Sequence, residues 1–538
     1  MEECNLKYGD GYKKILFKPS HNVDILDKNF LSEKKEEEVI KRALLNPIGS
    51  RRINELITPE DKLCIVISDV TRLWQKPRVF LPNKNFLSEK KEEEVIKRAL
   101  LNPIGSRRIN ELITPEDKLC IVISDVTRLW QKPRVFLPNK NFLSEKKEEE
   151  VIKRALLNPI GSRRINELIT PEDKLCIVIS DVTRLWQKPR VFLPILIEEI
   201  KKSGIKDENI IFLCALGSHR KQSKEEHIKI LGENLFKRFK IIDHYSKTKD
   251  EMVYIGETSF KTPVFVNKLV KECTKVIITG GITFHDMAGF GGGRKSILPG
   301  ISSYETIMAN HALVLNPNKN GINPNCSCGN LENNPMHLDM MEACDMIKPS
   351  FLLNVIMNSK GNITEAVAGD YAKAFERGCE LLQDSNGIKI KKLKDTVIVS
   401  AGGFPKDINL YQSSKALSNA KEAVKKGGKI ILFTQCIEGI GNKEVEEIIN
   451  NFNNNEEREE ESRRKFTVSK FAAYLICSIA KEYELILISD IKEELVSKAG
   501  IRVFEDESII NEILKENEEI YLMPDGSSLL PIYSNIQK

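Results

Sequence analysis

The chain has 538 residues, a net charge of +5, and 41% hydrophobic and 30% charged residues, which excludes a disordered or fibrous protein and allows two or three domains with buried cores. No apolar run approaches the roughly 18 residues of a membrane span, and the first residues lack the basic and apolar regions of a signal peptide. Twelve cysteines without a CxxC pair are typical of reduced thiols. We therefore expect a cytoplasmic protein that binds no membrane.

One segment occurs three times in succession, at residues 28–82, 84–138 and 140–194. Each copy carries more basic than acidic residues, so the repetition accounts for the positive charge, and that charge does not indicate a nucleic acid partner. Solenoid repeats diverge and have atypical end repeats, whereas these copies do not differ. We interpret them as a recent tandem duplication or a sequence-assembly artefact. Only the third copy continues into residues 195–204, which complete a helix, so we expect it to belong to the fold.

Apolar runs alternate with amphipathic helical patterns along the first part of the chain. After a short strand at 14–18, each copy predicts a charged helix, a turn, a second short helix and a strand. The main predicted strands are 175–180, 210–216, 276–279 and 351–357. This alternation is typical of a mostly parallel sheet covered by helices, in which ligands bind at the carboxyl ends of the strands.

A polar, lysine-rich segment at 384–394 predicts a domain boundary. Beyond it we expect strands at 396–400, 429–434, 485–489 and 520–523. The charge run at 450–465 reads as a solvated loop or a frayed helix. The predicted fold class is α/β with two domains, each a mostly parallel sheet flanked by helices, and an active site in the cleft between them. The first domain is 1–385 and includes the three copies, the second is 386–525, and a tail at 526–538 could pack back on the first.

The stretch 280–300 is unusually rich in glycine and follows a buried strand. Glycines suit a backbone that turns sharply and approaches a ligand closely. The stretch contains His285 and Lys295, and His311 follows it. A glycine-rich turn with a solvated lysine is one interpretation. A phosphate-binding loop is another, but Arg294 stands where the second glycine of that motif belongs.

The spacing of His285, Lys295 and His311 resembles the core of the nickel-pincer lactate racemase family. In that family the lysine carries a covalently attached, nicotinate-derived pincer, and the later histidine completes the nickel coordination. The resemblance implies a pyridinium thioamide/thiocarboxylic acid mononucleotide on Lys295, nickel bound by His311, and cofactor contacts from Gly291 and Gly292. Imidazole is a suitable nickel ligand. Cofactor-synthesis enzymes are then expected partners.

Two histidines match the acid and base of this family. His219 lies in the run Gly217-Ser218-His219-Arg220, and His285 precedes the glycine loop. Racemising a 2-hydroxy acid requires a base on each face of the carbon, and two neutral imidazoles near pH 7 meet that requirement. The resemblance implies that they move the hydroxyl proton while a hydride goes to the pincer.

The run Asp181-Val182-Thr183-Arg184 follows a predicted strand. It has an ordinary interpretation as a helix N-cap. It also resembles the D-x-T-R motif of the family, which implies that Asp181 and Arg184 contact the cofactor and that Arg184 offers a planar fork to a substrate carboxylate.

Three side chains of the second domain lie on one predicted helix face: Tyr411, Gln412 and Lys415. In an ordinary interpretation, the tyrosine packs in the hydrophobic core and the lysine is a solvent-exposed helix residue. The resemblance implies that all three contact the substrate, whose carboxylate would accept hydrogen bonds from them.

The resemblance implies an isomerase, a racemase or epimerase of a short 2-hydroxy acid such as lactate, that uses proton-coupled hydride transfer to the nickel pincer. One alternative is a nucleotide- or NAD-dependent α/β enzyme that uses the glycine loop for phosphates, although a G-x-G-x-x-G run after a strand is missing. A non-catalytic two-domain protein that binds a small molecule is another. The residues do not fix which hydroxy acid is bound.

Overall fold

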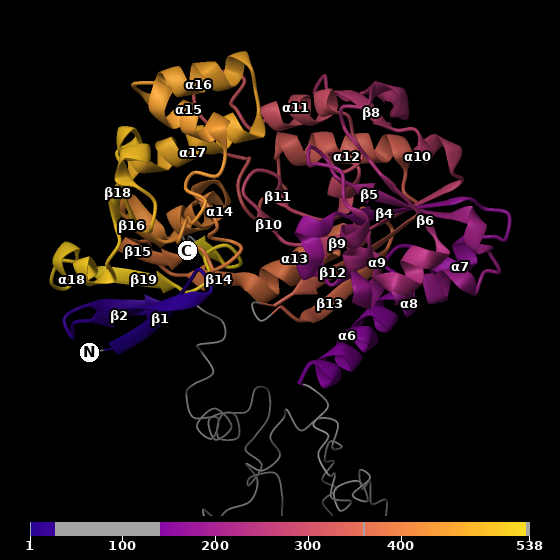
Figure 1. Ribbon diagram of the computed structural model, residues 1–538, viewed down its shortest axis with the longest axis horizontal. Coiled ribbons are helices and arrows are strands. Elements are labelled where there is room, and N and C mark those ends of the chain that lie inside the picture. Colours follow the sequence, from indigo (N-terminus) through magenta and orange to yellow (C-terminus); the bar gives the residue numbers. More distant parts are fainter. Residues whose placement is uncertain (1, 27–139, 359–360, 534–538) are drawn as a thin grey trace, which may run out of the picture. The chain divides into compact units, whose positions relative to one another are not determined.

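The computed structural model describes residues 2–26, 140–358 and 361–533 (Figure 1). The first two copies of the repeated segment, 28–82 and 84–138, lie outside the described residues. The third copy contributes two complete α-helices, a central strand of the first sheet, the 3-10 helix Val182–Gln187 and the first residues of the helix Pro189–Lys201. Within the described ranges, no helix is both long and apolar enough to cross a membrane.

The first sheet has six strands in the order β13-β12-β9-β4-β5-β6. All neighbours are parallel except β12 and β13, which are antiparallel. The strands are β4 (Leu175–Ser180), β5 (Ile210–Ala215), β6 (Lys240–Asp243), β9 (Lys275–Ile282), β12 (Phe351–Met357) and β13 (Ile363–Gly369). The central strands are almost wholly buried, which explains their continuous apolar runs, because both faces of such a sheet are covered by helices.

Two hydrophobic clusters cover the two faces of this sheet. Successive side chains of a strand point to opposite faces, so Ile177 belongs to the cluster of Phe192 and Val178 to the cluster of Met340. The helices of this part are α6 (Lys140–Leu157), α7 (Ile165–Leu168), α8 (Pro189–Lys201), α9 (Lys224–Arg238), α10 (Leu269–Glu272), α11 (Tyr304–Ala312), α12 (Pro335–Ile347) and α13 (Lys373–Asn386). Two small antiparallel pairs are β7 (Met252–Glu257) with β8 (Pro263–Asn267), and β10 (Phe284–His285) with β11 (Gly289–Phe290).

The second sheet has six parallel strands in the order β18-β17-β16-β15-β19-β3. The strands are β3 (Asn22–Ile25), β15 (Lys394–Ser400), β16 (Val424–Phe433), β17 (Glu484–Ile488), β18 (Arg502–Phe504) and β19 (Glu519–Met523). The helices are α14 (Leu410–Ala420), α15 (Lys443–Asn451), α16 (Asn455–Arg464), α17 (Val468–Glu482) and α18 (Ile510–Ile513). The predicted fold class, α/β with two mostly parallel sheets flanked by helices, is confirmed.

The first residues of the chain belong with the second sheet. A hairpin of β1 (Glu2–Tyr8) and β2 (Gly11–Phe17) precedes β3, which pairs with β19. Leu6 and Ile15 lie in one hydrophobic cluster with Ile398. The predicted first domain includes these residues, but their strand pairing and core contacts are with the second sheet. At the other end, β20 (Leu530–Tyr533) pairs with β14 (Gly387–Ile390), and residues 534–538 lie outside the described chain.

The charge run at 450–465 is more ordered than we expected. Most of it forms α16, and Arg458 is buried in the structure. Its guanidinium donates hydrogen bonds to the backbone carbonyls of Ile448, Ile449, Phe452 and Lys498. The interpretation as a solvated loop or frayed helix is therefore wrong, because free carbonyls near the end of a neighbouring helix compensate the buried charge.

Candidate active site

Three sequence motifs follow neighbouring strands of the first sheet. The run 181–184 follows β4, the run 217–220 follows β5, and the stretch 283–300 follows β9. Because β9, β4 and β5 are adjacent and parallel, their carboxyl ends lie at one edge of the sheet. The topology therefore brings these motifs to the same edge.

Asp181 and His219 form a hydrogen-bonded pair across two of these loops. The Asp181 side chain is 3% exposed, and its Oδ2 lies 2.5 Å from Nδ1 of His219. Oδ1 accepts hydrogen bonds from the amide and the hydroxyl of Thr183. Burial alone would raise the pKa of Asp181, but the bonds from His219 and Thr183 and the charge of Arg184 together lower it. The carboxylate is therefore an acceptor for Nδ1–H, which leaves Nε2 of His219 as the basic nitrogen.

Arg184 lies in a short 3-10 helix, Val182–Gln187, whose N-cap is Asp181. Its Nη1 donates to Thr183 Oγ1 at 2.9 Å, and the side chain is exposed. The N-cap interpretation of this run is therefore confirmed. It does not compete with a binding role for Arg184, because the capping carboxylate leaves the guanidinium free to meet an anion.

His285 and Lys295 are in direct contact. Nε2 of His285 lies 2.8 Å from Nζ of Lys295, and Nδ1 accepts hydrogen bonds from the amides of Met287 and Ala288. Oδ1 of Asp286 also lies 3.2 Å from Nδ1. Burial, followed by the charge of Lys295, holds the pKa of His285 well below its ordinary value. The imidazole is therefore neutral.

The amine of Lys295 titrates far below an ordinary lysine. Burial and then the charge of Arg294 lower its pKa to about 7. An amine with this pKa is largely unprotonated slightly above neutral pH, and an unprotonated amine is the form that can attack a carbonyl or thiocarbonyl carbon.

Arg294 is a residue of the site whose role the sequence did not reveal. Its side chain is 0% exposed and donates to the carbonyls of Ala288 and Phe290, both at 2.7 Å. The guanidinium lies 4.4 Å from the ring centroid of Phe375. It therefore fixes the backbone of the glycine loop and places a positive charge beside Lys295. The only indication of this role in the sequence is that an arginine directly follows a run of glycines.

The two glycines predicted to contact the cofactor are tightly enclosed by protein. Gly292 has a φ of +80°, and a Cβ there would lie 2.9 Å from Oδ1 of Asn354. A Cβ on Gly291 would lie 2.9 Å from the methyl group of Thr283. Both positions therefore require glycine for the loop itself, and a cofactor contact stays a prediction.

His311 has the geometry of a nitrogen ligand. It lies in the last turn of α11, where Nδ1 donates to the carbonyl of Ile307 at 2.9 Å. This bond fixes the tautomer and leaves the lone pair of Nε2 free, the arrangement usual for metal-binding histidines. Burial and then the charge of Lys295 lower its pKa to about 3, so it stays neutral. Among the described residues, no group of three or more His, Cys, Asp or Glu could hold a metal, so other ligands would come from a bound group.

The predicted substrate residues of α14 are under the electrostatic influence of the first sheet's loops. Nζ of Lys415 donates to Oε1 of Gln412 at 3.3 Å. Partial desolvation and then the charge of Arg184 lower the pKa of Lys415, although its side chain is exposed. Burial and then the charge of Asp286 raise the pKa of Tyr411. These residues therefore belong to the same electrostatic neighbourhood, whereas a cleft between the two domains stays a prediction.

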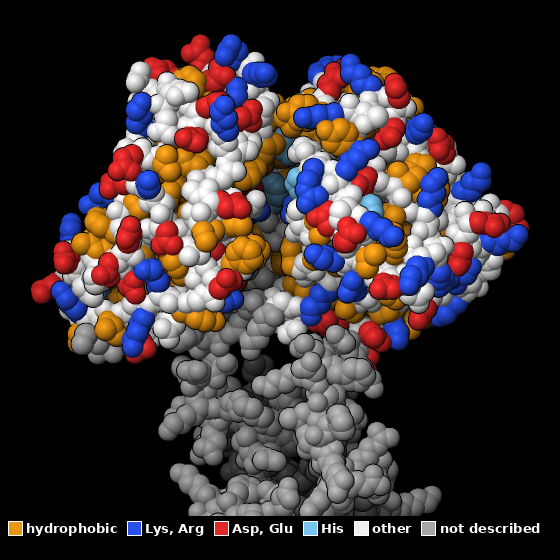
Figure 2. All heavy atoms as spheres, viewed as in Figure 1, with side chains coloured by type: hydrophobic (Ala, Val, Ile, Leu, Met, Phe, Trp, Pro, Cys, Tyr) orange, Lys and Arg blue, Asp and Glu red, His pale blue; other side chains and the backbone are white. Residues whose placement is uncertain are grey.

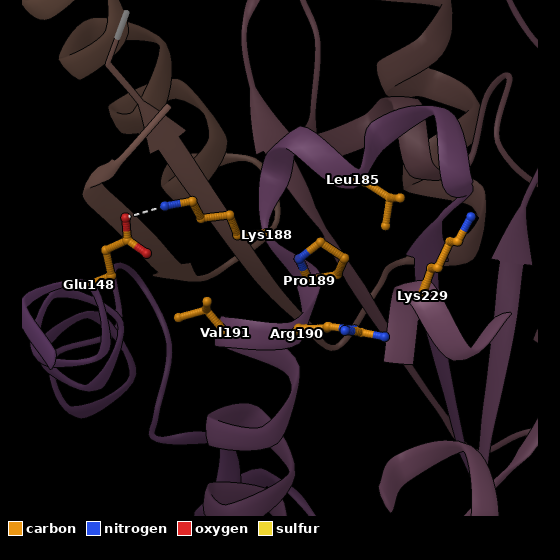
Figure 3. Close-up of a pocket in the computed structure, with 7 residues that line it drawn as sticks. All are labelled: Glu148, Leu185, Lys188, Pro189, Arg190, Val191 and Lys229. Carbon is orange, nitrogen blue, oxygen red and sulfur yellow. Dashed lines mark hydrogen bonds and ion pairs between the residues drawn. The ribbon is translucent and has the colours of Figure 1, made fainter. Parts of the chain in front are cut away.

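A separate surface cavity of about 340 Å³ contains none of the predicted site residues (Figure 3). Its lining is Glu148, Leu185, Lys188, Pro189, Arg190, Val191 and Lys229. Glu148 accepts a hydrogen bond from Lys188 at 2.6 Å and another from the amide of Ile363, which ties α6 to β13. Figure 2 shows acidic and basic side chains interspersed over the visible face. The surface in view therefore offers no large patch of one charge.

Comparison with known families gives a consistent result. The family model for the lactate racemase N-terminal domain matches residues 8–83, 77–141 and 131–322, and the model for the lactate racemase C-terminal domain matches 389–530. The three overlapping N-terminal matches follow the repetition of the sequence.

Individual relatives agree. The chain is 33% identical over 398 residues to the lactate racemase of Thermoanaerobacterium thermosaccharolyticum, which covers 71% of this chain and 90% of the relative. It is 30% identical over 393 residues to that of Lactiplantibacillus plantarum, which covers 71% and 91%.

Solved structures extend the comparison. The lactate racemase apoprotein from T. thermosaccharolyticum matches with a TM-score of 0.67 and 32% identity, covering 72% of this chain and 93% of that one. A crystal structure of a protein from Thermotoga maritima matches with a TM-score of 0.52 and 19% identity, covering 72% and 98%, and supports the fold alone.

The fold, the loops at the carboxyl edge of the first sheet and the matches to known families together define this protein as an α/β isomerase. The chain belongs to the lactate racemase family.

Proposed function

We propose that the protein is a nickel-pincer-dependent racemase of a short 2-hydroxy acid, with lactate as the favoured substrate. The observation that carries this proposal is the 2.8 Å contact between His285 and Lys295, together with the lowered pKa of both side chains. It supplies a neutral amine for covalent attachment of a pyridinium thioamide/thiocarboxylic acid mononucleotide. His311, with Nε2 free and its tautomer fixed, would bind the nickel.

Lys295 and His311 would hold the nickel pincer, which would supply reversible hydride acceptance at C2 of the substrate. The chain's own residues would handle the proton. Nε2 of His219 takes the hydroxyl proton on one face, and Asp181 stabilises the imidazolium that forms. His285 acts on the other face, where burial and neighbouring cations keep it neutral before the reaction.

A cluster of cations supports an acidic substrate. Arg184 lowers the pKa of both Lys295 and Lys415, so these positive charges are close enough to repel one another. A carboxylate would relieve that repulsion. The planar guanidinium of Arg184 would bind the substrate carboxylate through paired hydrogen bonds, and Gln412 and Lys415 would donate further hydrogen bonds to the same carboxylate.

Metal analysis and intact-mass measurement test the proposal. The protein must be made together with the cofactor-synthesis enzymes, because an ordinary host would give the unmodified chain. We expect nickel, a mass increment on the Lys295 peptide, and interconversion of D- and L-lactate. A nucleotide- or NAD-dependent enzyme, or a non-catalytic binding protein, would show neither nickel nor the increment. Lactate turnover by unmodified, nickel-free protein would contradict the proposal.

A series of 2-hydroxy acids with increasing side-chain length tests the substrate. In a pocket that fits a methyl group, each added methylene should cost roughly 1–3 kcal/mol of transition-state binding free energy. The value of kcat/KM should therefore fall stepwise from lactate to the longer acids. A maximum at a longer acid would leave the reaction class intact and replace lactate as the substrate.

A further inference from the structure

The turn of the N-terminal hairpin lies at the carboxyl edge of the second sheet. The hydroxyl of Ser400, at the end of β15, donates to the carbonyl of Lys7 at 2.6 Å. The amide of Phe404, in the loop after β15, donates to the carbonyl of Gly9 at 2.8 Å. The carboxyl edge of such a sheet is where open α/β folds bind their ligands. In this protein, hydrogen-bond donors at that edge are bonded to carbonyl groups of the N-terminal hairpin.

Asp407 is the centre of this contact. Its side chain is 1% exposed, and Oδ2 accepts the amide of Gly9 at 2.6 Å and, more weakly, that of Gln435 at 3.4 Å. The backbone carbonyl of Asp407 accepts the amide of Cys436. Its Oδ1 has no hydrogen-bond partner within the described chain. The free-energy cost of burying this carboxylate is therefore offset mainly by the hydrogen bond from the Gly9 amide.

The hairpin turn fits this edge closely. Gly9 has a φ of +53°, and a Cβ there would lie 2.2 Å from Oε1 of Gln435. The hydroxyl of Tyr8 donates to Oδ1 of Asp490 at 2.5 Å, and burial raises the pKa of Tyr8, so it remains a donor. The turn is thus held by loops that follow β15, β16 and β17.

The same loop leads into α14. Asp407 lies two residues before Asn409, whose side chain caps the helix by accepting the amide of Gln412 at 3.0 Å. We infer that Asp407 is a positioning residue: together with the hairpin turn it fixes the start of α14 and thereby the placement of Gln412 and Lys415 against the substrate carboxylate. This inference rests on the proposed function, which makes Gln412 and Lys415 the binding groups.

Kinetics of the cofactor-loaded protein provide the first test. Asp407→Ala removes the acceptor, whereas Asp407→Asn keeps an amide oxygen that can accept the Gly9 amide. We expect Asp407→Ala to raise KM for lactate about tenfold with kcat changed less than about threefold, because only substrate placement is lost. Asp407→Asn should restore most of the affinity. Asp10→Asn, which changes an exposed carboxylate of the same turn, is the matched control and should leave KM unchanged.

Hydrogen exchange provides a readout that does not depend on activity. Peptides covering 404–420 should exchange faster in Asp407→Ala than in the wild type, and those covering 285–311 should not change. Tyr8→Phe is a second variant in case Asp407→Ala does not fold, since it removes only the hydroxyl bonded to Asp490. It should produce the same pattern with a smaller effect, about twofold to threefold in KM.

The outcomes separate the inference from the proposed function. Unchanged exchange over 404–420, or a KM no higher than in Asp10→Asn, overturns the inference. Loss of kcat at constant KM also overturns it, because that result would mean a direct role in the chemistry. If the wild-type protein does not racemise lactate, the proposed function fails, and the exchange result alone decides whether the hairpin fixes α14.

Discussion

The two histidines proposed as acid and base occupy contrasting environments. The His219 side chain is 45% exposed and bonded to the carboxylate of Asp181. The His285 side chain is 23% exposed, contacts Lys295, and has a pKa well below its ordinary value. The carboxylate of Asp181 fixes the orientation of the His219 ring, whereas burial beside cations disfavours the charged form of His285. The two histidines are thus held differently: His219 by a carboxylate at a more exposed position, and His285 by burial beside an amine.

Removing the amine beside His285 should have the greatest effect on activity. Lys295→Arg keeps a positive charge but loses the nucleophile needed for attachment. We expect no mass increment and a loss of racemisation greater than about 10³-fold. Peptide mapping of protein made with the cofactor-synthesis enzymes is the measurement. An adduct on a different lysine, or normal activity of the variant, would disprove the assignment.

The next largest effects should come from the histidines themselves. His219→Ala and His285→Ala should each lower kcat by roughly 10²-fold to 10⁴-fold in both directions, because every turnover uses both faces of the carbon. Nickel should stay bound in both variants. His311→Ala should instead lose the metal while keeping the lysine adduct. Racemisation that survives in either single variant would contradict the two-base scheme.

Asp181→Asn sharpens the comparison by changing only the His219 side. The amide oxygen can still accept Nδ1–H, but the negative charge that stabilises the imidazolium during the reaction is lost, so we expect roughly a tenfold to hundredfold loss of kcat. The reactivity of Lys295 should not change. If the loss equals that of His219→Ala, then Asp181 has a further role at the cofactor.

The His285 side can be tested through the titration of Lys295. In the cofactor-free protein, acylation of Lys295 should reach half its maximum rate at about pH 7, against about 10.4 for an ordinary lysine. The sign follows from proton binding: between these values the unfolded chain binds the proton more tightly, so this group makes the free energy of unfolding rise with pH. Mass spectrometry of the Lys295 peptide, with the exposed Lys443 as internal control, measures the rate. A midpoint near pH 10 would contradict the buried environment.

The smallest effect should come from shortening the chain. Deleting 83–194, or any two whole copies, leaves one copy joined to residue 195, and an insertion of this kind costs little loop-closure entropy. We expect unchanged kcat/KM and better solubility. Arg184→Ala in the full chain should raise KM, whereas Arg72→Ala and Arg128→Ala, which lie outside the described residues, should not. Damage by Arg72→Ala would mean that the first copy builds the site.

Much of the sheet framework was predictable. The strands 175–180 and 351–357 have the same ends in the structure as in the prediction, because a parallel strand covered on both faces is a continuous apolar run. Strand–helix alternation also predicted that the ligand-binding loops follow the carboxyl ends of the strands, whereas the order of the strands came from the structure. The sequence placed His285 and Lys295 in one glycine-rich stretch, and the structure brings the two side chains into contact.

Other features depend on residues that are distant in sequence. Nothing local in 2–26 indicates that β3 pairs with β19, because an edge strand's pattern does not specify its partner. Likewise, a lone arginine is normally exposed, and only the fold brings Phe375 and the carbonyls of 288 and 290 around Arg294. The order of residues along the chain is enough to show which residue types follow which strands. Only the tertiary structure decided their solvation and partners, because burial and pKa shifts arise from atoms that the chain brings together across hundreds of residues.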